Sequence, residues 1–203
     1  MNQHNPANPL FQKMVDSVVP EQGIRFHLIR HGETDWNAKQ LFQGQQDIPL
    51  NPNGTRQVKL LVPRIRRIHV ARIITSNLSR AAETAEILGT GLDLKIDRDR
   101  RWNELSFGDW EGYDYSTIQE KFPDVLNRWQ ADPIYESAPN GESINKLAER
   151  VTSAFRDLLQ FSGEGDTLIV AHGGPLQILL CLLLDLPLSK YWQLRLNNAS
   201  HSS

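Results

Sequence analysis

Two histidines of this 203-residue chain stand directly after short apolar runs, and each is followed by glycine. His31 comes after Arg30 and the run 24–29, and His172 comes after the run 167–171. Runs of this length, rich in β-branched residues, are typical of buried strands. In open α/β sheets, ligands bind beyond the carboxyl ends of the strands. If these two strands are parallel neighbours, both imidazoles come to the same edge of one sheet.

A second cationic side chain, Arg80, stands in the first turn of a predicted helix, 78–88, which follows a third apolar run, 71–76. We expect Ser76 and Asn77 to cap that helix. Helix N-termini favour anions through their free N–H groups and the helix dipole, and a guanidinium fork matches phosphate. Two histidines, two arginines and helix ends therefore predict a phosphate pocket.

Phosphoryl transfer is the chemistry that such a set could perform. The transferred group carries spread negative charge, so cations must surround its oxygens, and Arg30 and Arg80 can do so. An imidazole can attack phosphorus in line when its other nitrogen is held by an acceptor, which makes His31 the candidate nucleophile. The leaving alkoxide needs a proton, and Glu104 is the candidate acid.

Other charged residues near these segments have competing interpretations. Glu33 and Glu111 also lie close to them in sequence, but we rank Glu104 above both as the acid and expect Glu111 to fix a loop. Glu142 could approach the site or supply charge at the start of a helix, and the sequence leaves both roles open. Arg101 is close enough to Glu104 in sequence to line the rim of a pocket.

The elements that must position these residues alternate along the chain. Strands are predicted at 24–29, 71–76, 95–99 and 167–171, and helices at 53–65, 78–88, 142–160 and 175–184, with one or two short helices within 116–130. This alternation argues for an α/β fold, a three-layer α/β/α arrangement with a mainly parallel central sheet. We expect 1–22 to form a flexible N-terminal arm and 23–203 a single domain with a helical and loop insertion at about 105–140.

Composition excludes several classes of function. The net charge is −2, so no overall positive field would attract nucleic acid or an acidic membrane. The single cysteine, Cys181, lies in an apolar run and is interpreted as a buried structural thiol; one cysteine excludes an intramolecular disulfide and a multi-cysteine zinc site. The N-terminus has no signal-peptide pattern, and the longest apolar run, 176–188, is shorter than a membrane span. We therefore expect a soluble cytoplasmic protein.

At the level of whole motifs, the chain resembles the histidine phosphatase superfamily, which includes cofactor-dependent phosphoglycerate mutases and many small phosphatases. Five blocks carry the resemblance in order: Leu28–Thr34 with Trp36 and Asn37, Gln43–Gly54, Ser76–Ala85, Glu104–Gly112, and Gly141–Ser143 with Ala171–Gly174. Together they extend over about 24–200, nearly the whole chain. Five blocks in the right order are far more specific than an Arg-His-Gly triplet alone.

The resemblance implies a phosphoglycerate mutase-like fold and a role for each matching residue. His31 would become a transient phosphohistidine, and Glu104 would be the proton donor and later the base that activates water. The substrate-binding set that it implies is Arg30, Asn37, Arg80, His172 and Gly173. It implies neither a metal nor an organic cofactor. The expected partner is a small phosphorylated metabolite, and a homodimer is left open.

The block around Glu104 favours hydrolysis over mutase activity. Mutases of the family usually read E-R-H-Y-G there and continue into a longer insertion, whereas this chain reads E-L-S-F-G and its insertion is short. The G-D-W-E-G and P-N-G-E-S elements resemble those of bacterial α-ribazole phosphatases and broad-specificity phosphatases. The prediction is a phosphatase for small phosphomonoesters. Its alternatives are an α-ribazole-5'-phosphate phosphatase specifically, a cofactor-dependent phosphoglycerate mutase and an inactive phospho-ligand binding module.

The C-terminal N-A-S element, 198–200, departs from the family pattern, because relatives usually continue from it into another strand. We expect that this strand is either missing or replaced here. We interpret the difference as one of sheet-edge stability, since the predicted chemistry lies upstream. His201 is predicted to lie on the surface and His27 in the core. The tryptophans are predicted to be packing residues, with Trp36 or Trp110 as a candidate wall for a substrate.

Overall fold

A five-stranded sheet forms the centre of the computed structural model, which describes residues 25–160 and 165–203. The expected arm, 1–22, lies outside the described residues. The strands lie in the order β3-β2-β4-β1-β5. Their bounds are β1 Phe26–Arg30, β2 Val70–Thr75, β3 Ile96–Arg98, β4 Asp166–Ala171 and β5 His201–Ser202. The first four pair in parallel and β5 pairs antiparallel to β1, which confirms a mainly parallel sheet.

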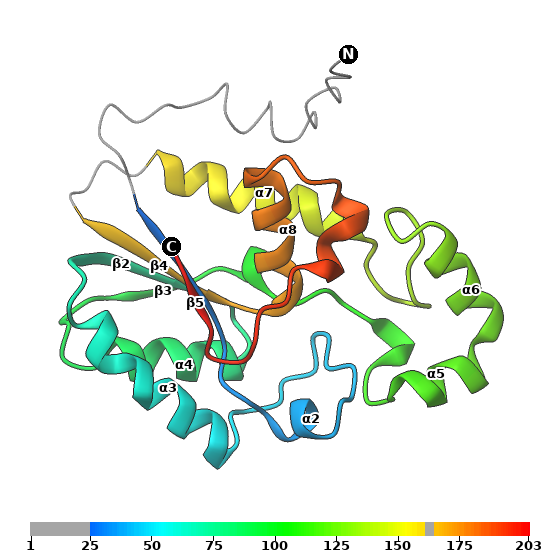
Figure 1. Cartoon of the computed structure of the whole chain (residues 1–203), viewed down its shortest axis with the longest axis horizontal. Helices are drawn as coiled ribbons and strands as arrows, with labels where there is room; N and C mark the ends of the chain where they lie inside the picture. Colours follow the sequence, from blue (N-terminus) through cyan, green and yellow to red (C-terminus); the bar gives the residue numbers. More distant parts are fainter. Residues whose placement is uncertain (1–24, 161–164) are drawn as a thin grey trace.

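Two pairs of helices cover the two faces of this sheet (Figure 1). One face is covered by α3 (Pro52–Ile65) and α4 (Ser79–Gly89), and the other by α7 (Ile144–Leu159) and α8 (Gly173–Leu183). Successive residues of a strand point to opposite faces. In β1, Leu28 packs with the core under α7 and α8, and Ile29 packs with the core under α3 and α4. The predicted three-layer α/β/α fold is confirmed.

Two short helices, α5 (Tyr115–Lys121) and α6 (Pro123–Ala131), lie to one side of these layers (Figure 1). Pro123 opens α6, because proline is tolerated at the first helical position but cannot continue a helix. They pack on a small separate core that contains Trp110, Ile118 and Leu126. This unit extends the structure beyond the edge of the sheet on the side of the Glu104 block (Figure 1).

Two helix starts differ from the sequence expectation. Helix α4 begins after Leu78, and Asp47 takes the capping role, since its carboxylate accepts from the backbone N–H of Ser79 at 2.6 Å and from the Ser79 hydroxyl at 2.8 Å. The prediction that Ser76 and Asn77 cap this helix is wrong, because a side chain from a distant loop supplies the acceptor. Helix α8 begins at Gly173 rather than at Pro175.

The C-terminal end of the chain is a short strand, β5, on the free edge of β1. His201 lies in it, with Nε2 2.8 Å from Nδ1 of the buried His27, whose Nε2 donates to the Asp166 carboxylate at 2.8 Å. The predicted surface position of His201 is therefore wrong, because pairing with β1 places its ring on His27. The strand that usually follows the N-A-S element is present, with two residues.

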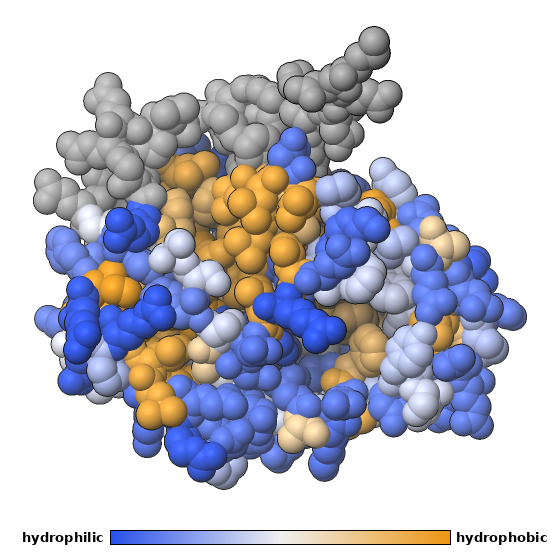
Figure 2. All heavy atoms as spheres, in the orientation of Figure 1, coloured by the Kyte–Doolittle hydropathy of each residue, from blue (hydrophilic) through white to orange (hydrophobic). Residues whose placement is uncertain are grey.

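Side chains on the outside of the fold are mostly hydrophilic in the view of Figure 2, with an apolar area over α8. The exposed leucines at the end of that helix are Leu183, Leu184 and Leu186. Cys181 is fully buried, and burial raises the pKa of its thiol to about 11, which confirms a structural thiol. Among the helices formed by the described residues, none is both long and apolar enough to cross a bilayer.

Candidate active site

The carboxyl ends of β1 and β4 bring the two histidines together. The strands are neighbours, and Arg30 lies opposite Ala171 in the parallel register, so His31 and His172 leave the sheet side by side. Their ring centroids are 5.0 Å apart, at an interplanar angle of 59°. Both side chains are buried. The sequence expectation that both imidazoles reach one edge is confirmed.

His31 is held in a single tautomer by its own loop. Its Nδ1 lies 2.6 Å from the carbonyl oxygen of Gly32, and a carbonyl can only accept, so Nδ1 carries the proton and Nε2 keeps its lone pair. Burial lowers the pKa of His31 well below its usual value, and the charges of Arg80 and Arg30 lower it further. The imidazole is therefore neutral at neutral pH, as a nucleophile must be.

His172 lies across the pocket with one nitrogen engaged. Its Nε2 lies 2.7 Å from the hydroxyl of Ser76, and its buried Nδ1 has no hydrogen-bond partner among the described residues. Burial lowers the pKa of His172 well below its usual value, with further contributions from Arg80, His31 and Arg30. A buried polar atom without a partner is uncommon and indicates a place for a ligand atom.

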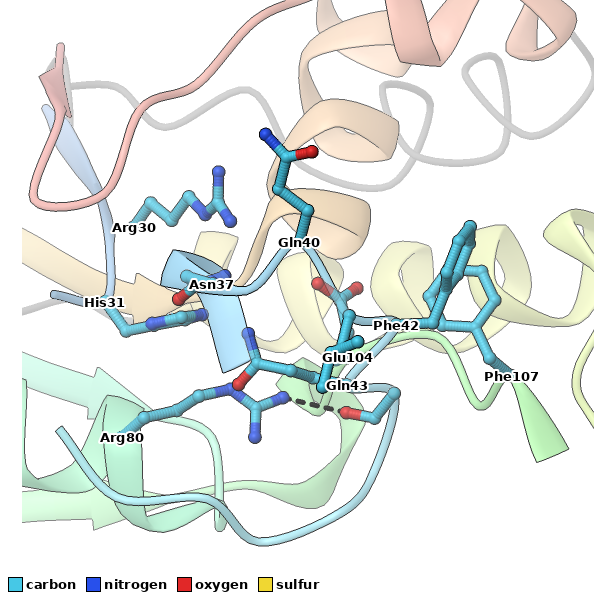
Figure 3. A pocket seen from close by; sticks show the side chains of 11 residues that line it. Arg30, His31, Asn37, Gln40, Phe42, Gln43, Arg80, Glu104 and Phe107 are labelled. Atoms are coloured by element: carbon cyan, nitrogen blue, oxygen red, sulfur yellow. Dashed lines mark hydrogen bonds between the residues drawn. The ribbon is translucent and has the colours of Figure 1, made fainter. Parts of the chain in front are cut away.

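Arg30 and Arg80 lie on either side of His31 (Figure 3). Arg80 is fully buried and donates from Nη1 to the Gln46 carbonyl at 2.8 Å and from Nη2 to the Gly44 carbonyl at 2.7 Å. Arg30 donates from Nη1 to the Leu196 carbonyl at 2.6 Å. The Nε of each arginine has no partner among the described residues. Burial lowers the pKa of Arg80 to about 10, so its charge persists at neutral pH.

Glu104 presents its carboxylate to the same hollow (Figure 3). Oε1 accepts from the backbone N–H of Leu105 at 2.8 Å and from that of Gly174 at 3.0 Å, in the first turn of α8. Glu33 instead accepts from Asn51 and Asn53.

Glu111 holds the loop that covers the arginine side of the hollow, as expected. Its Oε1 accepts from the backbone N–H groups of Gln45 and Phe107, and its Oε2 accepts from the Gln46 side chain. Because Gln46 and Gly44 also accept from Arg80, this glutamate and that arginine order the same turn. The segment therefore closes over the site rather than standing free of it.

Asn37 and Gly173 complete the sequence-predicted set. Asn37 lines the hollow from α2 (Asp35–Ala38), and its Oδ1 accepts from the backbone N–H of Thr34 in a capping box. Gly173 lines an adjoining hollow beside Glu104 at the start of α8. Among the described residues, no group of three or more histidine, cysteine, aspartate or glutamate side chains is arranged to hold a metal ion.

Aromatic side chains other than the expected tryptophans wall these hollows. Phe107 lines both, and Tyr191 and Trp192 line the one beside Gly173. Trp192 is 62% exposed, so the expectation that it is a packing residue is wrong. Trp110 is fully buried in the core under α5 and α6, where it cannot contact a substrate. The local sequence could not separate these residues, because each stands in an aromatic or apolar context.

Two further residues lie at the site, although the motifs that contain them do not indicate this role. Asn198 donates from Nδ2 to the carbonyls of His31 at 3.2 Å and Gly32 at 3.3 Å, and to Oδ1 of Asn37 at 3.1 Å. The N-A-S element therefore supports the nucleophile loop, and the view that it affects only the sheet edge is wrong. Ser76 is buried and bridges His172 to the side chain of Asn103.

Glu142 and Arg101 lie outside the hollows. Glu142 forms an ion pair with Arg150, with Nε 2.7 Å from Oε1, and does not appear among the residues that line either hollow. Arg101 donates to Asp99 and Asp157, away from Glu104, so the expectation that it lines the rim is wrong. Its carboxylate partners lie before and beyond the Glu104 block, and they draw the side chain to α7.

The chain is similar to known proteins over most of its length. The model of the histidine phosphatase superfamily (branch 1) matches residues 26–203. A Serratia proteamaculans protein named "Probable phosphoglycerate mutase GpmB" is 35% identical over 187 residues, with 88% of this chain and 83% of the relative covered. Phosphoserine phosphatase 1 of Hydrogenobacter thermophilus is 30% identical over 179 residues, with 88% and 85% covered. The crystal structure of the α-ribazole phosphatase from Shigella flexneri matches with a TM-score of 0.82 at 28% identity, with 88% of each chain covered. On this evidence the chain belongs to the histidine phosphatase superfamily, branch 1.

Proposed function

We propose that this chain hydrolyses small phosphomonoesters through a phosphohistidine formed on His31. Nε2 attacks phosphorus while the bond from phosphorus to the ester oxygen breaks, and Glu104 gives its proton to that oxygen. Water then attacks the phosphohistidine, Glu104 takes a proton from it, and inorganic phosphate leaves. His31 and the protonated Glu104 are thereby restored. Each turnover consumes one ester and one water and needs no other reactant.

The observation that carries this proposal is the state of His31. A neutral ring whose Nδ1 donates to Gly32 presents a free Nε2 lone pair between two guanidinium groups (Figure 3). A structural histidine in this position would use both nitrogens to satisfy protein partners. The cations that depress its pKa are also the groups that draw a phosphoryl dianion to it.

Arg30, Arg80 and His172 supply the phosphate site in this scheme. The Nε–H groups of the two arginines and Nδ1 of His172 are buried donors or potential donors that have no partner within the described part of the chain. Three phosphoryl oxygens offer acceptors for them. Asn37 on α2 and Gly173 at the start of α8 line the two hollows and would contact the ester there.

The leaving group faces a neutral and partly aromatic wall. Among the residues that line the two hollows, the only cations are Arg30 and Arg80, which the phosphoryl group occupies. Lys39 and Arg195 stand close in sequence to lining residues but are exposed and line neither hollow. We therefore propose esters with an uncharged leaving group as the substrate class, with the apolar part of that group lying against Phe107 and Trp192.

A cofactor-dependent phosphoglycerate mutase is the second candidate, because several relatives, the Serratia proteamaculans protein among them, are named as probable phosphoglycerate mutases. A mutase must hold a phosphoglycerate carboxylate in addition to its phosphate, which requires a further cation or donor set. The lining residues offer Gln40, Gln43 and Gln177 for this purpose and no third cation. Hydrolysis therefore fits the lining better.

A trapping experiment tests the nucleophile. The parent protein mixed briefly with a labelled ester and quenched in alkali should carry label in an acid-labile, alkali-stable bond, as a phosphohistidine does. His31→Ala should lose both the label and p-nitrophenyl phosphate hydrolysis, by about 10³-fold or more. Hydrolysis at the parent rate by His31→Ala would refute the assignment.

A substrate panel tests the leaving-group class. The panel contains α-ribazole phosphate and a simple alkyl phosphate, which leave neutral alcohols, and 3-phosphoglycerate and phosphoserine, which leave charged ones. We expect kcat/KM to be higher for the first pair. Mutase turnover that depends on bisphosphoglycerate and exceeds hydrolysis would establish the second candidate instead.

A further inference from the structure

The backbone that carries Glu104 is held by one side chain of α7. Arg150 donates from Nη1 to the carbonyls of Arg101 and Asn103, both at 2.7 Å. It donates from Nη2 to the carbonyl of Glu104 itself at 3.0 Å. Three carbonyls of one short loop thus converge on a single guanidinium group, although loop carbonyls are usually satisfied by water or by neighbouring turns.

Glu142 completes this arrangement from the other side of the loop. Its carboxylate accepts from Arg150 Nε at 2.7 Å and Nη2 at 2.8 Å, so each N–H of the guanidinium has an acceptor. The backbone N–H of Glu142 donates to the Ser106 carbonyl at 2.8 Å. The pair is mostly buried, with side-chain exposures of 18% for Arg150 and 16% for Glu142. The incoming and outgoing ends of the Glu104 loop are therefore tied to one ion pair.

The orientation of the Glu104 carboxylate depends on this backbone. Oε1 accepts from the N–H of Leu105, the next residue, and from Gly174 on α8. If the peptide between Glu104 and Leu105 rotates, the first of these bonds is lost and the carboxylate leaves its place beside the hollow. A displacement of about 1 Å at a reacting group can cost about 10²-fold in rate.

We propose that Arg150 and Glu142 form a positioning pair that places the acid of the reaction. The proposal rests on the proposed role of Glu104. Neither residue lines the hollows, so neither is expected to touch substrate. The pair acts on Glu104 through the loop 101–106, and it is rigid because α7 packs along its buried face on the core of the sheet. It also supplies a role for Glu142 that the sequence left open.

A leaving-group comparison distinguishes positioning from a general structural role. An alkyl phosphate needs a proton on its departing oxygen, whereas p-nitrophenolate leaves without one. Arg150→Lys keeps the charge but cannot serve three carbonyls and a carboxylate at once. We expect it to lower kcat for the alkyl ester by roughly 10- to 100-fold and kcat for p-nitrophenyl phosphate by less than about 3-fold. KM for both should change little.

Two further variants complete the comparison. Glu142→Gln should also lower kcat for the alkyl ester more than kcat for p-nitrophenyl phosphate, but by a smaller factor than Arg150→Lys does. This variant provides the test if Arg150→Lys does not fold. In the double variant of Arg150→Lys with Glu104→Gln, the alkyl ester should lose no more than with Glu104→Gln alone, because the pair acts through that acid. Full additivity of the two losses would overturn the proposal.

Arg101→Lys is the matched control. Arg101 lies at the same loop and donates to Asp99, Ser153 and Asp157, but to none of the loop carbonyls. It should leave the ratio of alkyl to aryl turnover unchanged. An equal change of that ratio in Arg101→Lys, or equal slowing of both esters by Arg150→Lys, would overturn the positioning role. If Glu104→Gln slows the alkyl and aryl esters equally, the assignment of Glu104 as the acid is refuted, and the positioning role of the pair is refuted with it. If Glu104→Gln slows mainly the alkyl ester but Arg150→Lys slows both esters equally, only the positioning role is refuted.

Discussion

The imidazole rings of His31 and His172 lie with their centroids 5.0 Å apart at the ends of neighbouring parallel strands. Burial lowers the pKa of each imidazole well below its usual value, and the charges of Arg80 and Arg30 lower both pKa values further. The free enzyme therefore holds two neutral imidazoles beside two guanidinium cations. A dianion that enters this site reverses the local electrostatics, because it favours the charged form of a nearby histidine.

Anion binding should therefore be accompanied by proton uptake. Inorganic sulfate is a suitable probe because, unlike phosphate, it does not itself titrate near neutral pH. We expect up to about one proton to be taken up per site near neutral pH, mainly on His172, whose Nδ1 has no partner among residues 25–160 and 165–203. Calorimetric titration in buffers of different ionisation enthalpy measures this uptake. His172→Gln should abolish it; uptake that persists unchanged in that variant would move the proton to His31.

Removal of the Asn198 side chain should slow catalysis more than it destabilises the fold. Asn198→Ala removes one donor from each of the carbonyls of His31 and Gly32, and Gly32 is the acceptor that sets the His31 tautomer. We expect kcat to fall about 10-fold or more and the free energy of unfolding to fall by about 1 kcal/mol. Asn197→Ala is the control, since that side chain is exposed. Equal kinetics in the two variants would show that Asn198 does not support the nucleophile.

Gly54 is required by the close approach of α3 to the nucleophile loop. A Cβ there would overlap the Glu33 carbonyl oxygen and lie 2.6 Å from the Glu33 nitrogen, so backbone would have to move. Gly54→Ala should cost roughly 1–3 kcal/mol of unfolding free energy and reduce kcat, because Glu33 follows Gly32 directly. At Gly91, φ is +80° and an added Cβ would lie 3.5 Å from Nη2 of Arg66, so we expect Gly91→Ala to cost about 1 kcal/mol of unfolding free energy and to leave kcat unchanged. Urea unfolding and steady-state kinetics measure both; loss of kcat in Gly91→Ala would contradict the local explanation.

Acidification should destabilise the protein partly through His201. Burial lowers the pKa of His201 from 6.5 to about 4, with smaller contributions from Arg64 and His27. Between these values the unfolded chain binds a proton that the folded chain does not, so the unfolding free energy falls as pH decreases from 6.5 towards about 4. His31 and His172 act in the same direction.

The contribution of His201 can be separated by substitution. His201→Gln should retain a donor for His27 and give a shallower decline of stability across this window, measured by urea unfolding at a series of pH values. An unchanged slope would show that His201 does not titrate differently in the folded and unfolded states. Asp166, which accepts from His27, is intact in both proteins and is therefore common to the two curves.

Local pattern was sufficient for most elements and for the centre of the site. The apolar period of α7, the β-rich run of β4 and the break at Pro123 are all properties of short windows, so the sequence predicts them. His31 and His172 were recognisable because each ends a strand, and parallel neighbouring strands bring such ends to one edge. Glu104 was preferred over Glu33 and Glu111 from the motif that contains it, and the structure places only Glu104 of the three in the hollow.

Contacts between segments far apart in sequence were decided by the tertiary structure alone. Asn198 reaches His31 because β5 folds back on β1. Asp47 supplies the capping acceptor in place of Ser76 because its loop lies at the start of α4. Arg150 sits mid-helix among other charged residues, and its sequence context does not reveal that three carbonyls converge on it. Residue types and the ends of strands are local properties, so the chain's sequence indicates which groups could do the chemistry. Only packing decided which side chains hold those groups in place, because that depends on the positions of all the layers at once.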